Sequence, residues 1–225
     1  MRKTIILDLG AGNNTKNNPS IIKEMIDQVY LLQHQTKKKI LIKFQLFSEM
    51  KDLIPLNRDL YIFAYYYAKT LNLEVLAGIF DEKNLQFISA FLKDTPYIKI
   101  ACRTSLYKYI GKIPKYVTIF VSVDSLQTRD KLKKKYPCHK LIYLYCVPEY
   151  PANYIKYESL FNGLGHSGNL NYSISDHTVN LGMYKRFEPE YYERHLLLSH
   201  EDCLDPFGSE FASTAKELEC ILWLQ

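Results

Sequence analysis

Two histidines in the C-terminal third of the chain, His177 and His195, have the residue type and setting of metal ligands. Each lies in a run that is typical of a β-strand. Period-two alternation places Ser175 on the same side as His177, and Glu193 on the same side as His195. Two imidazoles on neighbouring strands can converge on one metal ion. Unrelated histidines are also common at such a separation, so the pair alone does not establish a site.

Lysines in apolar strands are the second chemical signal. Lys43 and Gln45 share one face of an apolar run, and Lys99 interrupts another such run. A buried lysine costs several kcal/mol unless it meets an anion or a wet cavity. Two interpretations remain open, a salt bridge inside a barrel and a clamp for phosphate or carboxylate. Tyr150 and Asp8, which follow or end predicted strands, are further candidates.

Short β-rich runs alternate with helical runs along most of the chain, a pattern typical of βα units around a parallel sheet. The predicted strands are Ile5–Leu9, Ile40–Leu46, Glu74–Ile79, Tyr97–Ala101, Val117–Ser122, Lys140–Val147, Tyr172–Ser175 and Tyr191–Leu197. Helices are predicted at about 19–35, 57–71, 82–93, 103–111, 125–136, 155–163 and 212–224. Eight strands predict an α/β fold, a single-domain (β/α)8 TIM barrel.

The unit between the seventh and eighth strands is predicted to be short. It contains Gly182 and Pro189 and has room for about two helical turns. In such barrels the active site lies at the C-terminal ends of the strands. The polar residues predicted at those ends are therefore the candidate site residues.

Composition excludes several classes of protein. The 225 residues include 29 Lys and Arg against 24 Asp and Glu, a net charge of +5 that is too small to predict nucleic-acid binding and suits a small anion. The five cysteines show no CxxC spacing, which predicts reduced thiols and a cytoplasmic protein. No apolar run approaches the roughly 20 residues of a membrane span, so no membrane association is expected.

The motifs occur in an order that resembles the sialic acid synthase family, which includes the N-acetylneuraminate, legionaminate and pseudaminate synthases. The resemblance extends from about Ile5 to Leu218. Its motifs are Lys43-Phe44-Gln45, Phe80-Asp81-Glu82, Lys99-Ile100-Ala101, Tyr145-Cys146 through Tyr150-Pro151, Ser175-Asp176-His177-Thr178 and Glu193-Arg194-His195. Single motifs are unspecific, whereas six in order at similar spacing are fairly specific.

The resemblance implies a condensation of phosphoenolpyruvate with an N-acetylated amino-sugar aldehyde, which gives a nine-carbon α-keto acid and phosphate. It implies a divalent cation, Mn²⁺ or Mg²⁺, held by His177 and His195. The implied catalytic residues are Asp8, Lys43 and Lys99. The implied substrate-binding residues are Gln45, Ser122, Tyr150, Ser175 and Asp176. Among them, Lys43, Lys99 and Ser175 would hold phosphoenolpyruvate, and Gln45, Tyr150 and Asp176 would face the sugar.

Several positions differ from the family pattern. Gly78 lacks a hydroxyl that the family uses toward phosphate, Cys102 and Thr104 replace a serine and a glutamate, and Pro148 replaces an asparagine. The small C-terminal antifreeze-like domain, which places an arginine on the sugar of a partner subunit, is not expected in residues 1–225; Arg103 or Arg186 is a candidate substitute. Two hypotheses follow: a short synthase, and a non-catalytic barrel that binds a metabolite or a full-length synthase. A homodimer is compatible with both.

Overall fold

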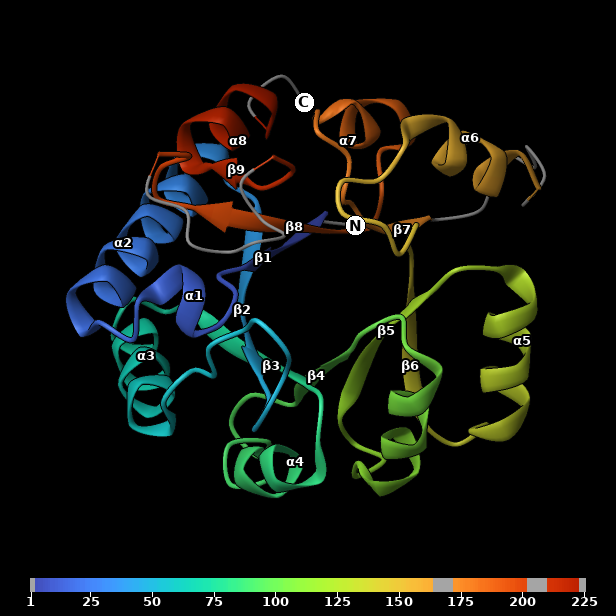
Figure 1. The fold of residues 1–225 in the computed structure, drawn as a ribbon, viewed down its shortest axis with the longest axis horizontal. Coiled ribbons are helices and arrows are strands. Elements are labelled where there is room, and N and C mark those ends of the chain that lie inside the picture. Colours follow the sequence, from blue (N-terminus) through green and yellow to red (C-terminus); the bar gives the residue numbers. More distant parts are fainter. Residues whose placement is uncertain (1–2, 164–171, 202–209, 223–225) are drawn as a thin grey trace.

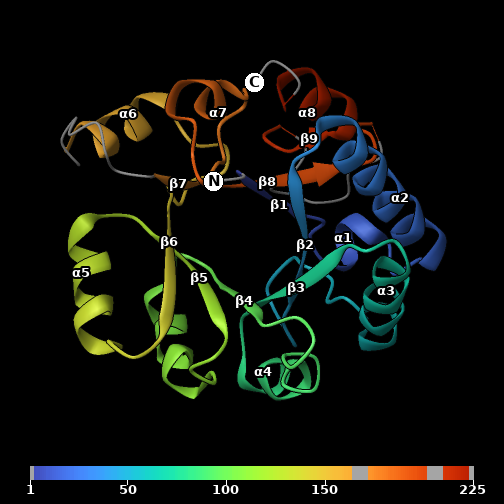
Figure 2. The same cartoon turned by 180° about the vertical axis from the view of Figure 1, so that it is seen from behind.

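A computed structural model describes residues 3–163, 172–201 and 210–222 of the chain. Its strands form a closed parallel barrel surrounded by helices (Figures 1 and 2). The strands are β1 (Thr4–Asp8), β2 (Lys39–Leu46), β3 (Glu74–Ile79), β4 (Tyr97–Ile100), β5 (Thr118–Val123), β6 (Lys140–Tyr145), β7 (Ser173–Ser175), β8 (Tyr191–Leu197) and β9 (Ser213–Thr214). Each strand from β1 to β7 pairs with the next, and β1 also pairs with β8. The predicted eight-stranded TIM barrel is confirmed.

The helices follow the strands as expected for βα units. They are α1 (Gly12–Thr15), α2 (Pro19–Thr36), α3 (Arg58–Thr70), α4 (Glu82–Ile88), the 3₁₀ helix η1 (Thr104–Lys112), α5 (Leu126–Lys135), α6 (Tyr154–Gly163), α7 (Gly182–Phe187) and α8 (Ala215–Leu222). The short α7 confirms the predicted small unit between β7 and β8. No helix among the described residues is both long and apolar enough to cross a bilayer.

Two predicted helices differ from the structure in extent or type. Helix α4 ends at Ile88 rather than near residue 93, because bonds such as Phe91 N–H to Ile88 O (2.9 Å) span three residues and tighten the chain. The segment after β4 is a 3₁₀ helix rather than an α-helix. The other helix starts are set locally: Asn18 caps α2 with Pro19 at its first position, and Asp81 caps α4.

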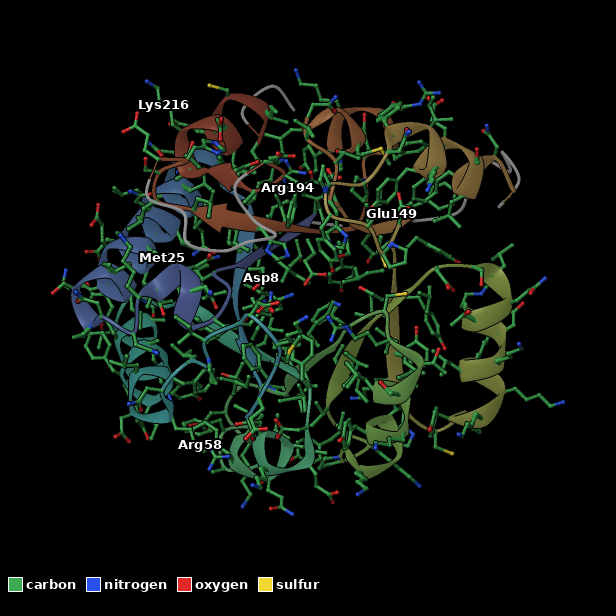
Figure 3. All side chains as sticks on the ribbon, viewed as in Figure 1. Asp8, Met25, Arg58, Glu149, Arg194 and Lys216 are labelled. Atoms are coloured by element: carbon green, nitrogen blue, oxygen red, sulfur yellow. The ribbon has the colours of Figure 1, made fainter. Side chains whose placement is uncertain are left out.

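The barrel interior is built in layers from alternate residues of each strand. The lower layer is apolar and consists of Ile6, Leu41, Leu76, Phe120 and Leu144. Two residues further along the chain, at or just after the C-terminal ends of these strands, stand Asp8, Lys43, Gly78, Ser122 and Cys146. The outward residues between these layers pack under the helices, and α2 contributes Ile22, Met25, Ile26 and Val29 to that core. Figure 3 labels Met25 on α2. The alternation therefore gives a polar layer above an apolar floor.

We predict that the floor is essential for stability. Phe120 is fully buried, with its ring centroid 5.9 Å from Tyr97 and 5.3 Å from Tyr191. Phe120→Ala should lower the free energy of unfolding by about 3–5 kcal/mol, because it leaves a cavity between rings that cannot collapse. Phe63→Ala, at a 36% exposed position of α3, should cost less than about 1 kcal/mol. Urea unfolding measures both, and equal losses would contradict the assignment of the floor.

Candidate active site

A cavity of about 560 Å³ opens at the C-terminal ends of the barrel strands. Nine predicted site residues line it: Asp8, Lys43, Gln45, Lys99, Ser122, Tyr150, Ser175, His177 and His195. Its wall also includes Gly78, Phe80, Cys102, Arg103, Cys146, Pro148, Glu193 and Phe211. The structure thus brings together residues as far apart in the sequence as Asp8 and Phe211, at the end of the barrel where TIM-barrel active sites form.

The Asp8 side chain of β1 contacts residues of two neighbouring strands, β2 and β8. The parallel register places it opposite Lys43 of β2 on one side and His195 of β8 on the other. Its Oδ2 atom lies 2.7 Å from Lys43 Nζ, 2.8 Å from Gln45 Nε2 and 3.3 Å from His195 Nε2, while Oδ1 accepts a bond from Gly10 N–H. Burial acts to raise the pKa of Asp8, but Lys43 and His195 outweigh it and the pKa is lowered. Asp8 is therefore a fixed carboxylate.

Glu193 is the second buried carboxylate, and both inward lysines contact it. Lys43 Nζ donates to Oε1, and Lys99 Nζ lies 3.4 Å from Oε2. Burial acts to raise the pKa of Glu193, yet Lys43 and Lys99 lower it well below its usual range. Alternation had already placed Glu193 beside His195, but its contact with two lysines was not predicted. The sequence left open whether the lysines form a salt bridge inside the barrel or a clamp for an anion. The salt bridge is present in the structure.

The two lysines differ in electrostatic state. Burial acts to lower the pKa of Lys43, but Asp8 and Glu193 outweigh it and raise the pKa. Burial also lowers the pKa of Lys99, and the single contact with Glu193 does not reverse that effect. The Nζ atom of Lys99 also donates hydrogen bonds to Ser122 Oγ (2.7 Å) and to the Ile100 carbonyl (3.2 Å). Lys43 is thus a firmly held cation, whereas Lys99 is the less compensated one.

The two histidines lie side by side, with ring centroids 5.9 Å apart. His177 Nδ1 is 3.1 Å from the Val147 carbonyl and can donate to it, an arrangement that leaves Nε2 as the acceptor atom. Burial, helped by the neighbouring His195, lowers the pKa of His177 to about 3, so this ring is neutral near pH 7. Tyr150 covers the ring at 4.2 Å.

The imidazole nitrogens of His177 and His195 are the atoms of this cavity that could bind a divalent cation. Within residues 3–163, 172–201 and 210–222, no group of three His, Cys, Asp or Glu side chains is arranged to hold a metal ion. A cation held by His177 and His195 would therefore need its remaining ligands from substrate or water.

Phe211 and Arg103 are cavity residues whose roles sequence reasoning missed or left open. Phe211 lies against His195 (4.9 Å), His177 (5.7 Å) and Tyr150 (5.3 Å), and no periodicity signals it because it precedes β9 in a connecting segment. Arg103 is at the rim of the cavity, 5.5 Å from the Phe80 ring. The other arginine considered, Arg186, is absent from the cavity lining and pairs with Glu158 at 3.0 Å.

Asp176, the tenth predicted site residue, does not line the cavity. Its carboxylate accepts bonds from Thr178 N–H (2.8 Å) and the Tyr192 hydroxyl (2.6 Å), and it lies 3.3 Å from Arg194 Nη1. Arg194 in turn donates to Ser213 Oγ of β9. Figure 3 shows Arg194 near α7 and α8, with Asp8 toward the barrel centre. The placement does not support a role for Asp176 toward a sugar.

Comparison with known proteins gives the fold but no family. No protein-family model matches the sequence, and no curated protein does. The chain is similar in structure to spore coat polysaccharide biosynthesis protein SpsE from Bacillus subtilis, with a TM-score of 0.75 and 16% identity over 98% of this chain and 66% of that one. A putative spore coat polysaccharide biosynthesis protein E from Chromobacterium violaceum gives a TM-score of 0.76 and 15% identity, over 99% and 73% of the two chains.

A third similar structure is the phospho-2-dehydro-3-deoxyheptonate aldolase (DAHP synthase) of Thermotoga maritima. Its TM-score is 0.65, with 9% identity over 97% of this chain and 67% of that chain. The present chain spans just under two thirds of the Bacillus protein. These likenesses establish the barrel fold.

We predict that removing Lys43 destabilises the protein strongly. Lys43→Met would leave Asp8 and Glu193 buried in one cavity without their shared cation, which should cost about 3–5 kcal/mol of unfolding free energy. Lys39→Met is the matched control on the same strand, because its bridge to Glu74 (2.6 Å) joins side chains that are 44% and 37% exposed. That control should cost about 0–1 kcal/mol. Urea unfolding that ranks the two variants equally would contradict the paired-cluster description.

We also predict that the network around Asp176 is structural. Arg194→Met would strand a buried carboxylate, and the unfolding temperature should fall by at least about 6 °C. Arg186→Met removes a half-exposed arginine and should change it by less than about 3 °C. Differential scanning calorimetry tests the pair. A small shift for Arg194→Met would show that Asp176 tolerates the loss of its cation.

Proposed function

We propose that this cavity condenses phosphoenolpyruvate with an N-acetylated amino-sugar aldehyde, giving a nine-carbon α-keto acid and phosphate. The observation that carries the proposal is the presence of cationic side chains and two adjacent imidazoles in one cavity at the C-terminal end of the barrel. The cationic side chains suit an anionic donor, and the two imidazoles suit the carbonyl group of an acceptor. Preorganised charges of this type are the usual source of rate enhancement.

The anionic donor would bind on the side of Lys99 and Ser122. Four cations line the cavity, Lys43, Lys51, Lys99 and Arg103, against the two carboxylates Asp8 and Glu193. Lys43 is already paired with both carboxylates, so its role is to hold them in place as much as to meet a ligand. Lys99, Arg103 and Lys51 are left to neutralise phosphate and carboxylate groups. Ser175, beside Glu193 in the register, would add a hydroxyl.

The carbonyl acceptor would bind on the side of the histidines. His177 and His195 would hold a divalent cation, Mn²⁺ or Mg²⁺, which when bound polarises an aldehyde carbonyl toward attack by the enol carbon. Gln45 and Tyr150 line the same side and would contact the sugar, with Asp8 fixing Gln45 at 2.8 Å. The names of the similar structures, which concern spore coat polysaccharide biosynthesis and a DAHP synthase, support a carbohydrate substrate.

A second candidate function is binding without turnover, of a metabolite or of a full-length synthase. The observation that favours it is the character of the cavity wall, in which Gly78, Cys102 and Pro148 stand where the family pattern has other groups. Under this hypothesis the lysines and carboxylates stabilise the barrel and hold a ligand weakly. The two functions differ in whether phosphate is released.

Phosphate release from phosphoenolpyruvate, measured with Mn²⁺ and N-acetylmannosamine or bacillosamine-derived sugars, tests the proposal. Turnover should stop on chelation and return with added Mn²⁺. Lys99→Ala should raise the KM for phosphoenolpyruvate about tenfold to hundredfold, because it removes a charge-assisted hydrogen bond. Lys93→Ala, an exposed lysine ahead of β4, should leave the KM unchanged.

Each alternative outcome has a distinct meaning. Absence of turnover with every sugar, together with thermal stabilisation by phosphoenolpyruvate or copurification with a full-length synthase, would favour the binding function. Turnover that persists after chelation would contradict the metal assignment to His177 and His195 while leaving the condensation itself intact. An unchanged KM in Lys99→Ala would show that Lys99 does not contact the donor.

A further inference from the structure

Lys99 occupies an unusual position for a lysine. It is only 3% exposed, yet it lines the cavity from the middle of the barrel on β4. Its Nζ atom lies 2.7 Å from Ser122 Oγ, 3.2 Å from the Ile100 carbonyl and 3.4 Å from Glu193 Oε2. Two of these three contacts are with neutral groups. The amine therefore faces the cavity with a single carboxylate in reach.

The Glu193 carboxylate contacts both Lys43 and Lys99, but it lies closer to Lys43. Lys43 contacts both Asp8 and Glu193 at hydrogen-bond distance, whereas Lys99 meets Glu193 at 3.4 Å, beyond the roughly 2.7–2.9 Å of a charge-assisted bond. Lys43 is also a nearby positive charge that disfavours the ammonium form of Lys99. Burial lowers the pKa of Lys99, whereas the pKa of Lys43 is raised. A desolvated lysine beside another cation is the setting in which the amine becomes a nucleophile.

We propose that the Lys99 amine forms a Schiff base with the carbonyl carbon of a small α-keto acid bound in the cavity. This is an activity beyond the proposed condensation and does not depend on it. The Lys99 ammonium first gives one proton to solvent. The Nζ lone pair then attacks the ketone carbon, and one of the two remaining Nζ protons moves to the carbonyl oxygen to give a carbinolamine. The second Nζ proton leaves with the hydroxyl group as one molecule of water, as the C=N bond forms. No oxidant or reductant is consumed.

The surroundings of Lys99 fit a keto acid better than a simple ketone. Arg103 and Lys51 line the same cavity, and neither forms an ion pair with a carboxylate among the residues that the structure describes. They are available for the carboxylate next to the reacting ketone. The Ser122 hydroxyl, at 2.7 Å from Nζ, can donate to the carbinolamine oxygen once the amine has lost its proton. The cavity volume of about 560 Å³ admits such a ligand.

Reductive trapping tests the inference on the unaltered protein. Pyruvate and cyanoborohydride are added without metal or phosphoenolpyruvate, and the secondary amine that forms from each lysine is located by peptide mapping. Lys99 should be modified at least about tenfold faster than Lys43, because Lys43 is paired with two carboxylates whereas Lys99 meets a single one at 3.4 Å. Lys43 is the matched internal control, since it lines the same cavity. Lactate, which keeps the carboxylate but lacks the ketone, should give no adduct.

Modification of Lys99 at a rate equal to or below that of Lys43 would overturn the proposal, as would an adduct confined to exposed lysines. Lys99→Arg keeps the charge and should abolish the cavity adduct while exposed lysines react as before. Should that variant fail to fold, as judged by thermal unfolding, the mapping of the unaltered protein still decides. The outcome is separate from phosphate release, because the trapping mixture contains neither the donor nor the cation of the proposed condensation.

Discussion

The sharing of the Glu193 carboxylate between Lys43 and Lys99 is the interaction on which the rest of this site depends. Charges inside a closed barrel must balance because each unpaired one costs several kcal/mol. With Asp8, the two lysines and Glu193 form a quartet of two positive and two negative groups in one polar layer. That balance lets the layer exist above an apolar floor. It also means that the quartet alone has no spare positive charge for an incoming anion.

The charge needed for a ligand must therefore come from outside the quartet or from a shift within it. Arg103 and Lys51 at the cavity rim are one source, and a cation held by His177 and His195 would be another. Within the quartet, an anion near Lys99 would compete with Glu193 at 3.4 Å far more easily than it would displace Lys43 from its two carboxylates. The geometry thus distinguishes Lys43, which holds two carboxylates in place, from Lys99, which can exchange its carboxylate for a ligand. The two lysines look alike in the sequence.

Alternation along the strands predicted most of this arrangement. For Asp176, alternation gave the correct side of the strand, whereas the motif resemblance suggested a sugar contact that the structure does not support. The same rule that placed Ser175 and His177 on the inner side requires the residue between them to point outward, where Arg194 meets it. The motif resemblance suggested a sugar contact for Asp176. The eight strands and their order followed from periodicity as well. What periodicity lacked was information across strands, so the contacts of Glu193 with two lysines became visible only in three dimensions.

The residues that the sequence located well lie on strands, and those that it located poorly lie on connecting segments. Asp8, Lys43, Lys99 and Glu193 stand on strands, where the alternating pattern indicates which face of the sheet each side chain takes. Arg103 and Phe211 stand on connecting segments, where no period exists and position depends on packing. Strand residues set the buried charges of the cavity, whereas the connecting segments set its rim and add Lys51 and Arg103. The buried charges of this cavity are therefore easier to infer from sequence than its rim, because the rim residues lie where the sequence carries the least geometric information.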